Sequence, residues 1–319
     1  MKNTNKNLNM KEIPIFFASD DNYLPFLDVT LMSLIEHASK DYLYSIYVLN
    51  TGLKEESMQK IKRFENKNFT INFVDMTDYI GDLHKKLKNV YHYSLAAYYR
   101  LFIQGKFPQY KKILYLDCDI VVLGDISKLY NVDMKGNMLA GVQDGFVQAV
   151  DAFRLYAKEA VGVNPTEYIN SGILVMDLEK FREEDIEDKF TYLLSTYNFD
   201  TVDPDQAYLN YFCRERKLLL PAGWNRTPAY LDYNGETNII HYALAKKPWQ
   251  TDVPLGEFFW HYAEKSAFYD EILKIRKSFT AEDLRKKEQA GVDIVEKALQ
   301  IVASRMSFYP TLLARVEIK

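Results

Sequence analysis

The sequence predicts an α/β fold built on a parallel sheet with crossover helices. Two observations lead to this prediction. Over residues 14–74, short apolar runs alternate with segments of helical spacing, and this rhythm is typical of parallel strands joined by helices. Further along, an apolar strand over 113–116 ends directly in two carboxylates, Asp117 and Asp119. Carboxylates at the carboxyl end of a parallel strand lie where α/β sheets bind their ligands.

Each predicted element follows from a local signal. The apolar run 14–19 predicts a strand, and Pro25 then opens a helix that extends to His37. Pro204 opens a helix that runs to 212, because proline is favoured in the first helical turn. The remaining predicted elements are strands over 44–49, 69–74, 113–116, 139–143, 173–176, 217–220 and 238–241, and helices over 54–65, over 94–102 and from 178 onward.

Composition and charge exclude several classes of function. The 319 residues are 48% hydrophobic and 26% charged, an ordinary balance for a globular protein with a sizeable core. The net charge of −4 argues against nucleic-acid binding. The two cysteines, Cys118 and Cys213, match no ligand or redox spacing and fit a reducing compartment. No apolar run approaches the ~18 residues of a membrane span, and the polar N-terminus lacks a signal-peptide core. We therefore expect a cytoplasmic protein.

The strongest functional signal is the segment 112–125, KILYLDCDIVVLGD. The paired carboxylates of Asp117 and Asp119 suit a hard cation such as Mg²⁺ or Mn²⁺, which in turn suits a phosphate. The alternative is a solvated strand end. A second Asp-x-Asp, formed by Asp203 and Asp205, straddles a helix start, where the ordinary role of an aspartate is to cap the helix. Position after a buried strand therefore favours the first pair as the metal site.

A histidine and a lysine follow the last predicted strand. A lone histidine is usually structural, but His241 is followed six residues on by Lys247, and Pro248 restrains the loop. A metal ligand and a lysine at this spacing could clamp a diphosphate, because lysine offers a point charge to phosphate. The alternative for Lys246 and Lys247 is that both are solvated at the surface.

Taken together, these motifs resemble glycosyltransferase family 8, which includes bacterial lipopolysaccharide galactosyl- and glucosyltransferases and the glycogenins. The resemblance spans about residues 13–250. It rests on six motifs in the family's order: FFASDDNY (16–23), YYRL (98–101), LYLDCD (114–119), INSGIL (169–174), DQAYLN (205–210) and a histidine followed by KPW (241–249).

The resemblance implies a GT-A fold, a UDP-sugar donor, Mn²⁺ with Mg²⁺ as the second option, and transfer with retention of anomeric configuration. By position, Asp117, Asp119 and His241 resemble the metal ligands. The residues that resemble the uridine site are Ala18, Asp20, Asn22 and Tyr23. Tyr23 would stack on uracil and Asn22 or Asp20 would read its polar edge, while Cys118 would contact the ribose through its main chain.

The same resemblance implies the contacts of the donor sugar, expected to be galactose or glucose. The residues that resemble these contacts are Arg100, Asn170, Asp205 and Gln206. The sequence departs from the family at one point. The family often has Gly-x-x-Lys-Pro-Trp, whose glycine lets the backbone approach phosphate. Here Leu244 stands at that position, which puts its contact in doubt, while Lys247 remains in place.

Gln206 and Asp205 are the candidate catalytic residues. Gln206 would lie near the anomeric carbon on its β face. Because glutamine is a poor nucleophile, we expect the acceptor to attack on the same face as the leaving diphosphate, with Gln206 stabilising the oxocarbenium ion. The metal and Lys247 would neutralise the charge that develops on UDP. The rival interpretations are a catalytically silent protein that binds UDP-sugars or carbohydrates, and hydrolysis of UDP-sugars as the physiological reaction.

We expect a catalytic domain over 1–254 and a helical appendage over 255–319. Residues 255–277 are helical and aromatic, and Thr280 begins a second helix. Apolar residues then recur at three- and four-residue spacing at Val292, Val295, Leu299, Val302, Met306 and Tyr309. This stripe predicts packing on the main domain or on a second copy of the chain. The alternative is peripheral docking at the inner face of an anionic membrane, near a carbohydrate or glycoconjugate acceptor.

Overall fold

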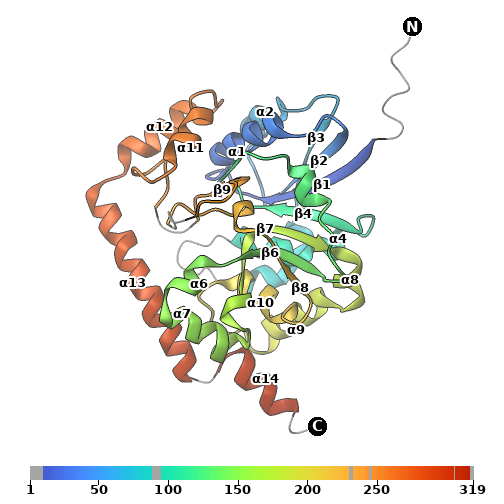
Figure 1. Ribbon diagram of the computed structural model, residues 1–319, viewed down its shortest axis with the longest axis vertical. Coiled ribbons are helices and arrows are strands. Elements are labelled where there is room, and N and C mark those ends of the chain that lie inside the picture. Colours follow the sequence, from blue (N-terminus) through green and yellow to red (C-terminus); the bar gives the residue numbers. More distant parts are fainter. Residues whose placement is uncertain (1–9, 88–94, 230–232, 244–245, 305, 317–319) are drawn as a thin grey trace.

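A seven-stranded sheet runs through the middle of the protein (Figure 1). The computed structural model describes residues 10–316 apart from 88–94, 230–232, 244–245 and 305. The strand order is β3-β2-β1-β4-β7-β6-β8. These strands are β1 (Lys11–Ala18), β2 (Tyr42–Asn50), β3 (Phe69–Asp75), β4 (Lys112–Leu116), β6 (Leu139–Gln143), β7 (Ile169–Asp177) and β8 (Lys217–Leu219).

The prediction of an α/β fold is confirmed, but the sheet is not wholly parallel. Strands β3, β2, β1 and β4 run parallel to one another, whereas β7 pairs antiparallel with both β4 and β6. This reversal has a direct consequence. The first residues of β7, Asn170 to Gly172, were expected to precede a strand, yet they belong to β7 and lie beside the carboxyl end of β4.

A second sheet of two strands, β5 (Ile120–Val122) and β9 (Ile239–His241), pairs segments far apart in the sequence. The pairing is antiparallel and places Ile120 opposite His241. Because β5 follows Asp119 immediately, this short pairing carries His241 to the two carboxylates.

Two hydrophobic clusters cover opposite faces of the large sheet, because alternate side chains of a strand point to opposite faces. The first cluster takes Phe16, and the second takes Ile15 and Phe17. The second cluster includes residues of α1 (Leu24–His37), α2 (Glu55–Lys62), α5 (Ile126–Tyr130), α11 (Gly256–Ala263) and α12 (Tyr269–Ser278).

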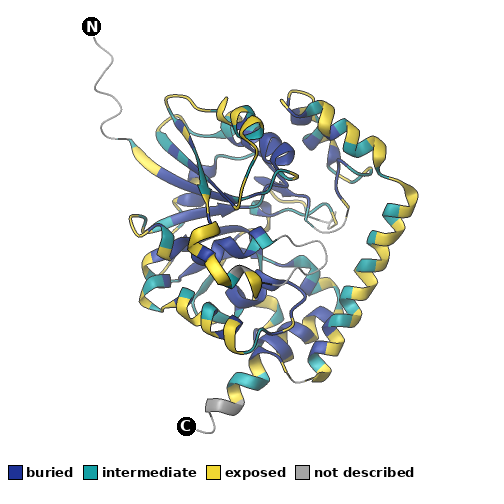
Figure 2. Ribbon diagram, turned by 180° about the vertical axis from the view of Figure 1, so that it is seen from behind, coloured by how far each residue is buried: buried dark blue, intermediate teal, exposed yellow. Residues whose placement is uncertain are grey.

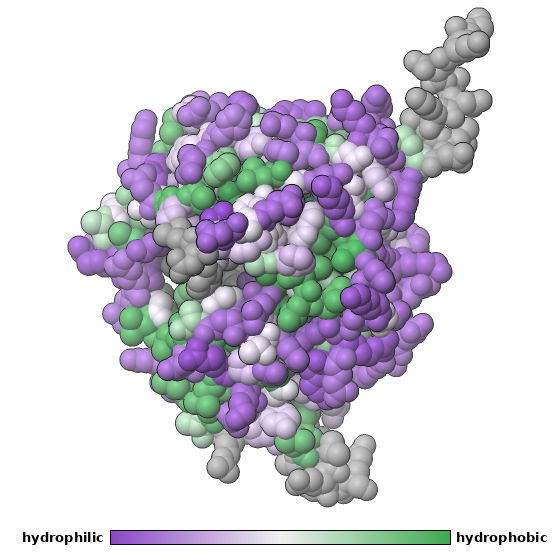
Figure 3. Space-filling view, viewed as in Figure 1, coloured by the Kyte–Doolittle hydropathy of each residue, from purple (hydrophilic) through white to green (hydrophobic). Residues whose placement is uncertain are grey.

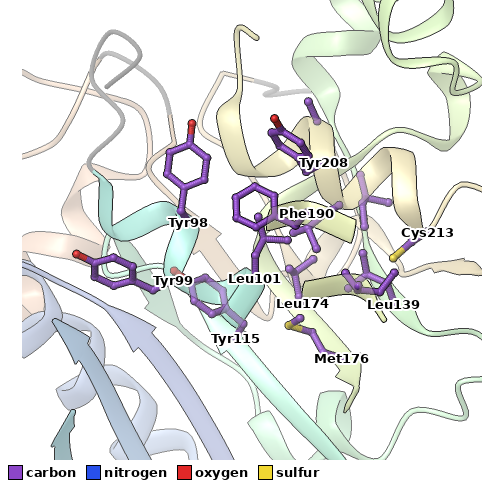
Figure 4. Packing of buried hydrophobic residues seen from close by; sticks show 14 of the residues in the cluster. Tyr98, Tyr99, Leu101, Tyr115, Leu139, Leu174, Met176, Phe190, Tyr208 and Cys213 are labelled. Atoms are coloured by element: carbon purple, nitrogen blue, oxygen red, sulfur yellow. The ribbon is translucent and has the colours of Figure 1, made fainter. Parts of the chain in front are cut away.

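The first cluster, part of which is drawn in Figure 4, is rich in aromatic side chains. Phe190, for example, meets Tyr208 edge-on with ring centroids 4.8 Å apart. Its helices are α3 (Thr77–Ile80), the 3₁₀ helix η3 (Leu95–Phe102), α4 (Ile103–Lys106), α6 (Gly145–Ala149), α7 (Asp151–Leu155), the π-helix η4 (Tyr156–Val161), α8 (Leu178–Glu183), α9 (Ile186–Thr196) and α10 (Pro204–Phe212). Shorter 3₁₀ turns lie at η2 (Gly81–Lys85), η5 (Pro165–Glu167) and η6 (Ala222–Trp224).

The C-terminal helices reach both clusters. The predicted start at Thr280 is confirmed, because Thr280 and Asp283 exchange side-chain-to-backbone hydrogen bonds ahead of α13 (Ala281–Ser304). Ala298 and Ile301 of α13 and Phe308 of α14 (Phe308–Val316) are buried in the first cluster. Figure 2 shows that most of α13 is nevertheless exposed along its length.

The predicted apolar stripe packs on the main domain only in part. The helix ends at Ser304, so the three- and four-residue spacing does not continue unbroken into α14. Val292, Leu299 and Met306 are exposed, whereas Val295 and Val302 pack against the first cluster. Hydrophilic side chains cover most of the face seen in Figure 3. No helix in the described part of the chain combines the length and the apolar character that a membrane span requires.

Candidate functional site

Four segments meet at the carboxyl end of β4. Asp117 and Asp119 directly follow this strand, and the N–H of Asp117 donates to the carbonyl of Gly172 in β7 at 2.8 Å. The N–H of Tyr242, just after β9, donates to the carbonyl of Asp119 at 3.0 Å. The fourth segment is the start of α10, from which the Gln206 side chain accepts a hydrogen bond from the N–H of Ser171 at 2.9 Å.

Close packing explains the glycine of the Asn-Ser-Gly segment. A Cβ atom on Gly172 would overlap Cε1 of His241 and would lie 2.7 Å from Oδ2 of Asp117. Only glycine therefore lets β7 pass this closely behind the two side chains. The sequence contains this glycine, but only the structure shows which atoms it makes room for.

The predicted metal ligands do converge. Asp117, Asp119 and His241 each offer one ligand atom, and these atoms all lie within 4.8 Å of one another. Nε2 of His241 is 3.2 Å from Oδ1 of Asp119 and 3.6 Å from Oδ2 of Asp117. The other oxygen of each carboxylate is held by a cation: Arg100 Nη2 lies 3.0 Å from Oδ1 of Asp117, and Lys247 Nζ lies 2.5 Å from Oδ2 of Asp119.

This arrangement suits a divalent cation. With metal–oxygen distances of about 2.1 Å, neighbouring ligands of an octahedral ion lie about 3 Å apart, and the separations around His241 Nε2 are close to this. Two carboxylate oxygens and one imidazole nitrogen are acceptable donors for Mn²⁺, and the carboxylates alone suit Mg²⁺ equally. The residues present therefore fit the metal that the family resemblance implies.

Buried charges set the ionisation of the site. Burial by itself raises the pKa of Asp119, but the Lys247 ammonium and His241 outweigh it and hold that pKa well below the usual range. Burial lowers the pKa of Arg100, and Asp205 and Asp117 more than reverse this, so the pKa rises and the guanidinium stays charged. Asp119 is consequently ionised at every pH at which the protein would work.

Lys247 is not solvated at the surface. Its ammonium is buried, and it donates to Asp119 and to the carbonyl of Tyr242 at 2.6 Å. Lys246, by contrast, is exposed and lies 3.2 Å from Glu288 of α13. Of the two neighbouring lysines, Lys246 is therefore solvated at the surface, whereas Lys247 is buried in the candidate site.

Asn225 orients the histidine, although its sequence context did not predict this role. Its Oδ1 lies 2.9 Å from Nδ1 of His241, and its Nδ2 donates to Oδ1 of Asn170 at 2.9 Å. Since an amide oxygen only accepts, Nδ1 donates to it, and Nε2 is the ring nitrogen that faces the two carboxylates and could coordinate a metal. The tryptophan-asparagine pair at 224–225 gave no sign of this in the sequence, because the contact spans sixteen positions.

The predicted sugar contacts form one buried network. Arg100 Nε lies 3.1 Å from Oδ2 of Asp205, its Nη1 donates to the carbonyl of Ser171, and its guanidinium lies 4.0 Å from the centre of the Tyr115 ring. Asn170 Nδ2 donates to Oδ2 of Asp144 at 3.1 Å. Asp144 was not singled out from the sequence, although it precedes α6 and caps it through the N–H of Phe146.

The expected uridine residues are only partly assembled. Ala18, Asp20 and Tyr23 line the same cavity as the carboxylates, and the Asp20 carboxylate accepts from the N–H of Tyr23 at 3.1 Å. Asn22 is exposed and does not line that cavity, because the turn that begins α1 leaves it on the outside. Cys118 also lines the cavity, and its carbonyl accepts from the hydroxyl of Thr30 at 2.8 Å. Leu244 lies outside the described residues.

Two adjoining cavities surround this network. The carboxylate cavity has a volume of about 140 Å³ and is lined by Asp117, Asp119, His241 and the other predicted site residues that the structure describes, Asn22 excepted. The amide cavity has a volume of about 550 Å³, and its lining includes Gln143, Phe146, Gln148, Arg226 and Tyr233. Both cavities are lined by Asp144, Asn170 and Ala243, so they meet at these residues.

Comparison with known proteins decides the family. A family model described as glycosyl transferase family 8 matches residues 14–252. The chain belongs to glycosyl transferase family 8. It is 28% identical over 272 residues to General stress protein A of Bacillus subtilis (strain 168), covering 78% of this chain and 92% of that protein. It is also 28% identical to the lipopolysaccharide 1,2-glucosyltransferase of Escherichia coli (strain K12), covering 76% of this chain and 75% of the relative.

Solved structures of other glycosyltransferases have the same fold as this family 8 glycosyltransferase. The bifunctional glycosyltransferase WbbM superposes with a TM-score of 0.72 at 25% identity, over 85% of this chain and 53% of that one. The galactosyltransferase LgtC, solved with donor and acceptor sugar analogs, gives a TM-score of 0.64 at 23% identity, over 86% of this chain and all of LgtC. The expected GT-A fold with a helical C-terminal region is therefore confirmed.

Proposed function

We propose that this family 8 glycosyltransferase transfers galactose or glucose from a UDP-sugar to a carbohydrate or glycoconjugate, with Mn²⁺ and with retention of anomeric configuration. The observation that carries the proposal is the convergence of Asp117, Asp119 and His241 with Gln206 around one cavity. Residues of all six family motifs line this cavity, although they are separated by more than 200 positions in the sequence.

The cations of the site would offset the negative charge of the diphosphate or hold the carboxylates beside it in position. A bound Mn²⁺ would polarise the phosphate oxygens and offset the charge of the leaving UDP. Lys247 already holds one oxygen of Asp119, so its charge is fixed next to the place where that negative charge develops. Arg100 is tied to Asp117 and Asp205 and would keep both carboxylates in position. Tyr23 and Asp20 line the wall of the cavity and would receive the uracil ring.

Retention would require either a nucleophile on the β face of the sugar or attack from the face that UDP leaves. Asp205 is buried in its ion pair with Arg100, so it is poorly placed to act as a nucleophile. The amide of Gln206 is a weak nucleophile, but its oxygen can stabilise positive charge on the anomeric carbon. We therefore favour attack by the acceptor on the face that UDP leaves, with Gln206 stabilising the oxocarbenium ion.

The amide cavity is the candidate acceptor site. It adjoins the carboxylate cavity at Asp144 and Asn170, so an acceptor hydroxyl bound there could reach the donor sugar. Its lining combines the aromatic rings of Phe146 and Tyr233 with polar side chains such as Gln148. Aromatic faces suit the C–H faces of sugars, and amides suit their hydroxyl groups.

We further propose that residues 1–254 form the catalytic domain and that the helices after residue 254 dock on it. Ala298, Ile301 and Phe308 of these helices are buried in the first cluster, which supports docking on the same chain. A cytoplasmic location, with peripheral contact to the membrane or to a second copy through the exposed part of α13, remains a proposal that follows from the sequence.

The decisive experiment measures hydrolysis of a panel of UDP-sugars with Mn²⁺, together with calorimetry of UDP binding. We expect UDP-galactose or UDP-glucose to be hydrolysed slowly, and UDP to bind more tightly with Mn²⁺ than with EDTA. Asp119→Ala should abolish both effects. Asp41→Ala removes an exposed carboxylate next to the amino end of β2 and should change neither. Equal UDP affinity with Mn²⁺ and EDTA, or faster turnover of a GDP- or ADP-sugar, would refute the proposal.

A further inference from the structure

The amide of Gln206 is held at three points. Its Oε1 accepts from the N–H of Ser171 at 2.9 Å, and its Nε2 donates to Oδ2 of Asp144 at 3.1 Å and to Oδ2 of Asp203 at 3.0 Å. An ionised carboxylate has no hydrogen to donate, so the opposite orientation of the amide would set its oxygen against two acceptors. The two carboxylates therefore fix the amide nitrogen on their side and leave the carbonyl oxygen with Ser171 at the carboxylate cavity.

Asp203 does not cap α10, contrary to the role expected of it. It occupies the position before the helix, but its side chain makes no capping hydrogen bond. Instead, its Oδ1 accepts from the hydroxyl of Tyr156 at 3.0 Å and its Oδ2 from the hydroxyl of Tyr168 at 2.6 Å. Among the residues that the structure describes, no lysine or arginine pairs with this buried carboxyl group. Burying a carboxylate with only neutral hydrogen-bond donors costs folding free energy, so we infer that Asp203 has a functional role.

The charge of Asp203 would act on the sugar through Gln206. A hydrogen bond from an amide N–H to an ionised acceptor is stronger than one to a neutral acceptor. Such a bond draws electron density toward the amide oxygen, because successive hydrogen bonds polarise one another. The polarised oxygen of Gln206 then stabilises a positive anomeric carbon better than it stabilises the neutral sugar, which is the condition for accelerating the reaction.

We propose that Asp203 is a positioning residue for glycosyl transfer, which fixes the orientation of the Gln206 amide and strengthens its carbonyl oxygen when ionised. This role rests on the proposed function, because it presupposes a glycosyl cation next to Gln206. Asp203 itself does not line the carboxylate cavity, so it acts through Gln206 and not on the sugar directly.

The surroundings of Asp203 place its charge change near neutral pH. Burial raises its pKa to about 7, although the Tyr168 and Tyr156 hydroxyls lower it. These two groups approach from the segment before β7 and from η4. The neighbouring Asp144, before α6, and Asp205, in α10, raise the pKa further. The charge of Asp205 is balanced by Arg100. We therefore expect kcat for donor hydrolysis to rise between about pH 6 and pH 8 as Asp203 ionises.

The test compares Asp203→Asn with the wild-type protein, using hydrolysis of UDP-galactose and UDP-glucose with Mn²⁺ from pH 5.5 to 8.5. The variant keeps the size of the side chain and an oxygen for Gln206 but cannot ionise. We expect kcat at pH 8 to fall by about tenfold, the rise with pH to disappear, and the affinity for UDP in the presence of Mn²⁺ to stay within about twofold.

A second variant changes the pKa of Asp203 and leaves the Asp203 side chain itself in place. Tyr156→Phe removes one hydrogen bond to the Asp203 carboxylate and leaves Gln206 untouched. Losing a donor that stabilises the charged form raises the pKa, so the midpoint of the pH profile should move upward by about one unit, with an unchanged rate at high pH. Tyr208→Phe is the matched control, because its buried hydroxyl has no hydrogen-bond partner among the described residues, and the midpoint should not move.

The outcomes are distinguishable. If Asp203→Asn retains kcat within about twofold and keeps the wild-type pH profile, the role of Asp203 is refuted while the proposed function stands. If the variant loses thermal stability and UDP affinity together, Asp203 is structural and the proposal is likewise overturned. If wild-type protein binds UDP but hydrolyses no UDP-sugar at any pH, the proposed function fails, and this role fails with it.

Discussion

Replacing Gly172 by alanine tests whether the space behind the side chains of Asp117 and His241 is needed for the predicted metal site. The added Cβ would lie 2.7 Å from Oδ2 of Asp117, whereas ordinary contacts begin near 3.4 Å, and it would overlap Cε1 of His241. One or both side chains must therefore move by roughly 0.7 Å or more, several times the tolerance of about 0.2 Å in metal–ligand distances. His241 is the nearer of the two side chains and is held by β9 and Asn225, so its imidazole must be forced out of this position, and Asp117 must shift as well.

The expected result is a loss of Mn²⁺ affinity of about 100-fold or more, with a comparable fall in kcat for donor hydrolysis. Isothermal titration of Mn²⁺ into the UDP-saturated protein measures the affinity directly. Gly291→Ala is the matched control, because a Cβ there meets nothing within 4 Å on the exposed helix α13. That change should leave Mn²⁺ binding intact and should stabilise the fold by about 1 kcal/mol. A Gly172→Ala protein that binds Mn²⁺ within twofold of wild type would refute the reasoning.

Three further predictions follow from other contacts. Asn225→Ala should lower Mn²⁺ affinity by about 10- to 100-fold, because His241 loses the hydrogen bond that fixes its tautomer; unchanged affinity in calorimetry would contradict this. Arg100→Lys should lower the free energy of unfolding by about 2–4 kcal/mol, because an ammonium cannot replace the planar guanidinium that contacts Asp117, Asp205 and Ser171 together. Urea denaturation measures this free energy, and a decrease below about 1 kcal/mol would contradict the prediction. The raised pKa of Asp203, about 7 when folded against about 3.9 when unfolded, means that the folded state holds the proton more tightly. This contribution to stability is complete below about pH 4 and is lost as the pH rises to about 7. Asp203→Asn should therefore gain stability relative to wild type by roughly 2–4 kcal/mol between pH 4 and pH 8, and a constant difference in urea denaturation would exclude this.

Much of the fold could be predicted from local sequence patterns. Alternating apolar runs predicted the β1-α1-β2-α2-β3 order correctly, and the strand before Asp117 was placed to within one residue. The 255–277 segment was helical as expected, but it divides into α11 and α12 around residues 264–268, a break that the aromatic pattern did not reveal. Local signals decide such elements because helix and strand periodicities depend on neighbours within a few positions.

The direction of β7 was decided by tertiary structure. Its apolar run fits a parallel strand and an antiparallel strand equally, since both bury the same side chains. Only the pairing with β4 and β6 selects the antiparallel direction, and that pairing brings Ser171 and Gly172 to the carboxylates. The sequence could supply the Asn-Ser-Gly motif but not the edge of the sheet at which it lies.

The sequence by itself determined the residue types of the site: two carboxylates after a buried strand, a histidine and lysine six residues apart, and a glutamine in the first turn of a helix. It could not determine the contacts that give them their properties. Asp119 and Lys247 are 128 positions apart, and Gln206 reaches Asp144 across 62. Asn225 carried no local signal, Asp203 carried one that pointed to helix capping, and Asn22 carried one for the uridine site yet is exposed. Hydrogen bonds and burial fix which oxygen meets which nitrogen, and both arise only when distant segments pack together.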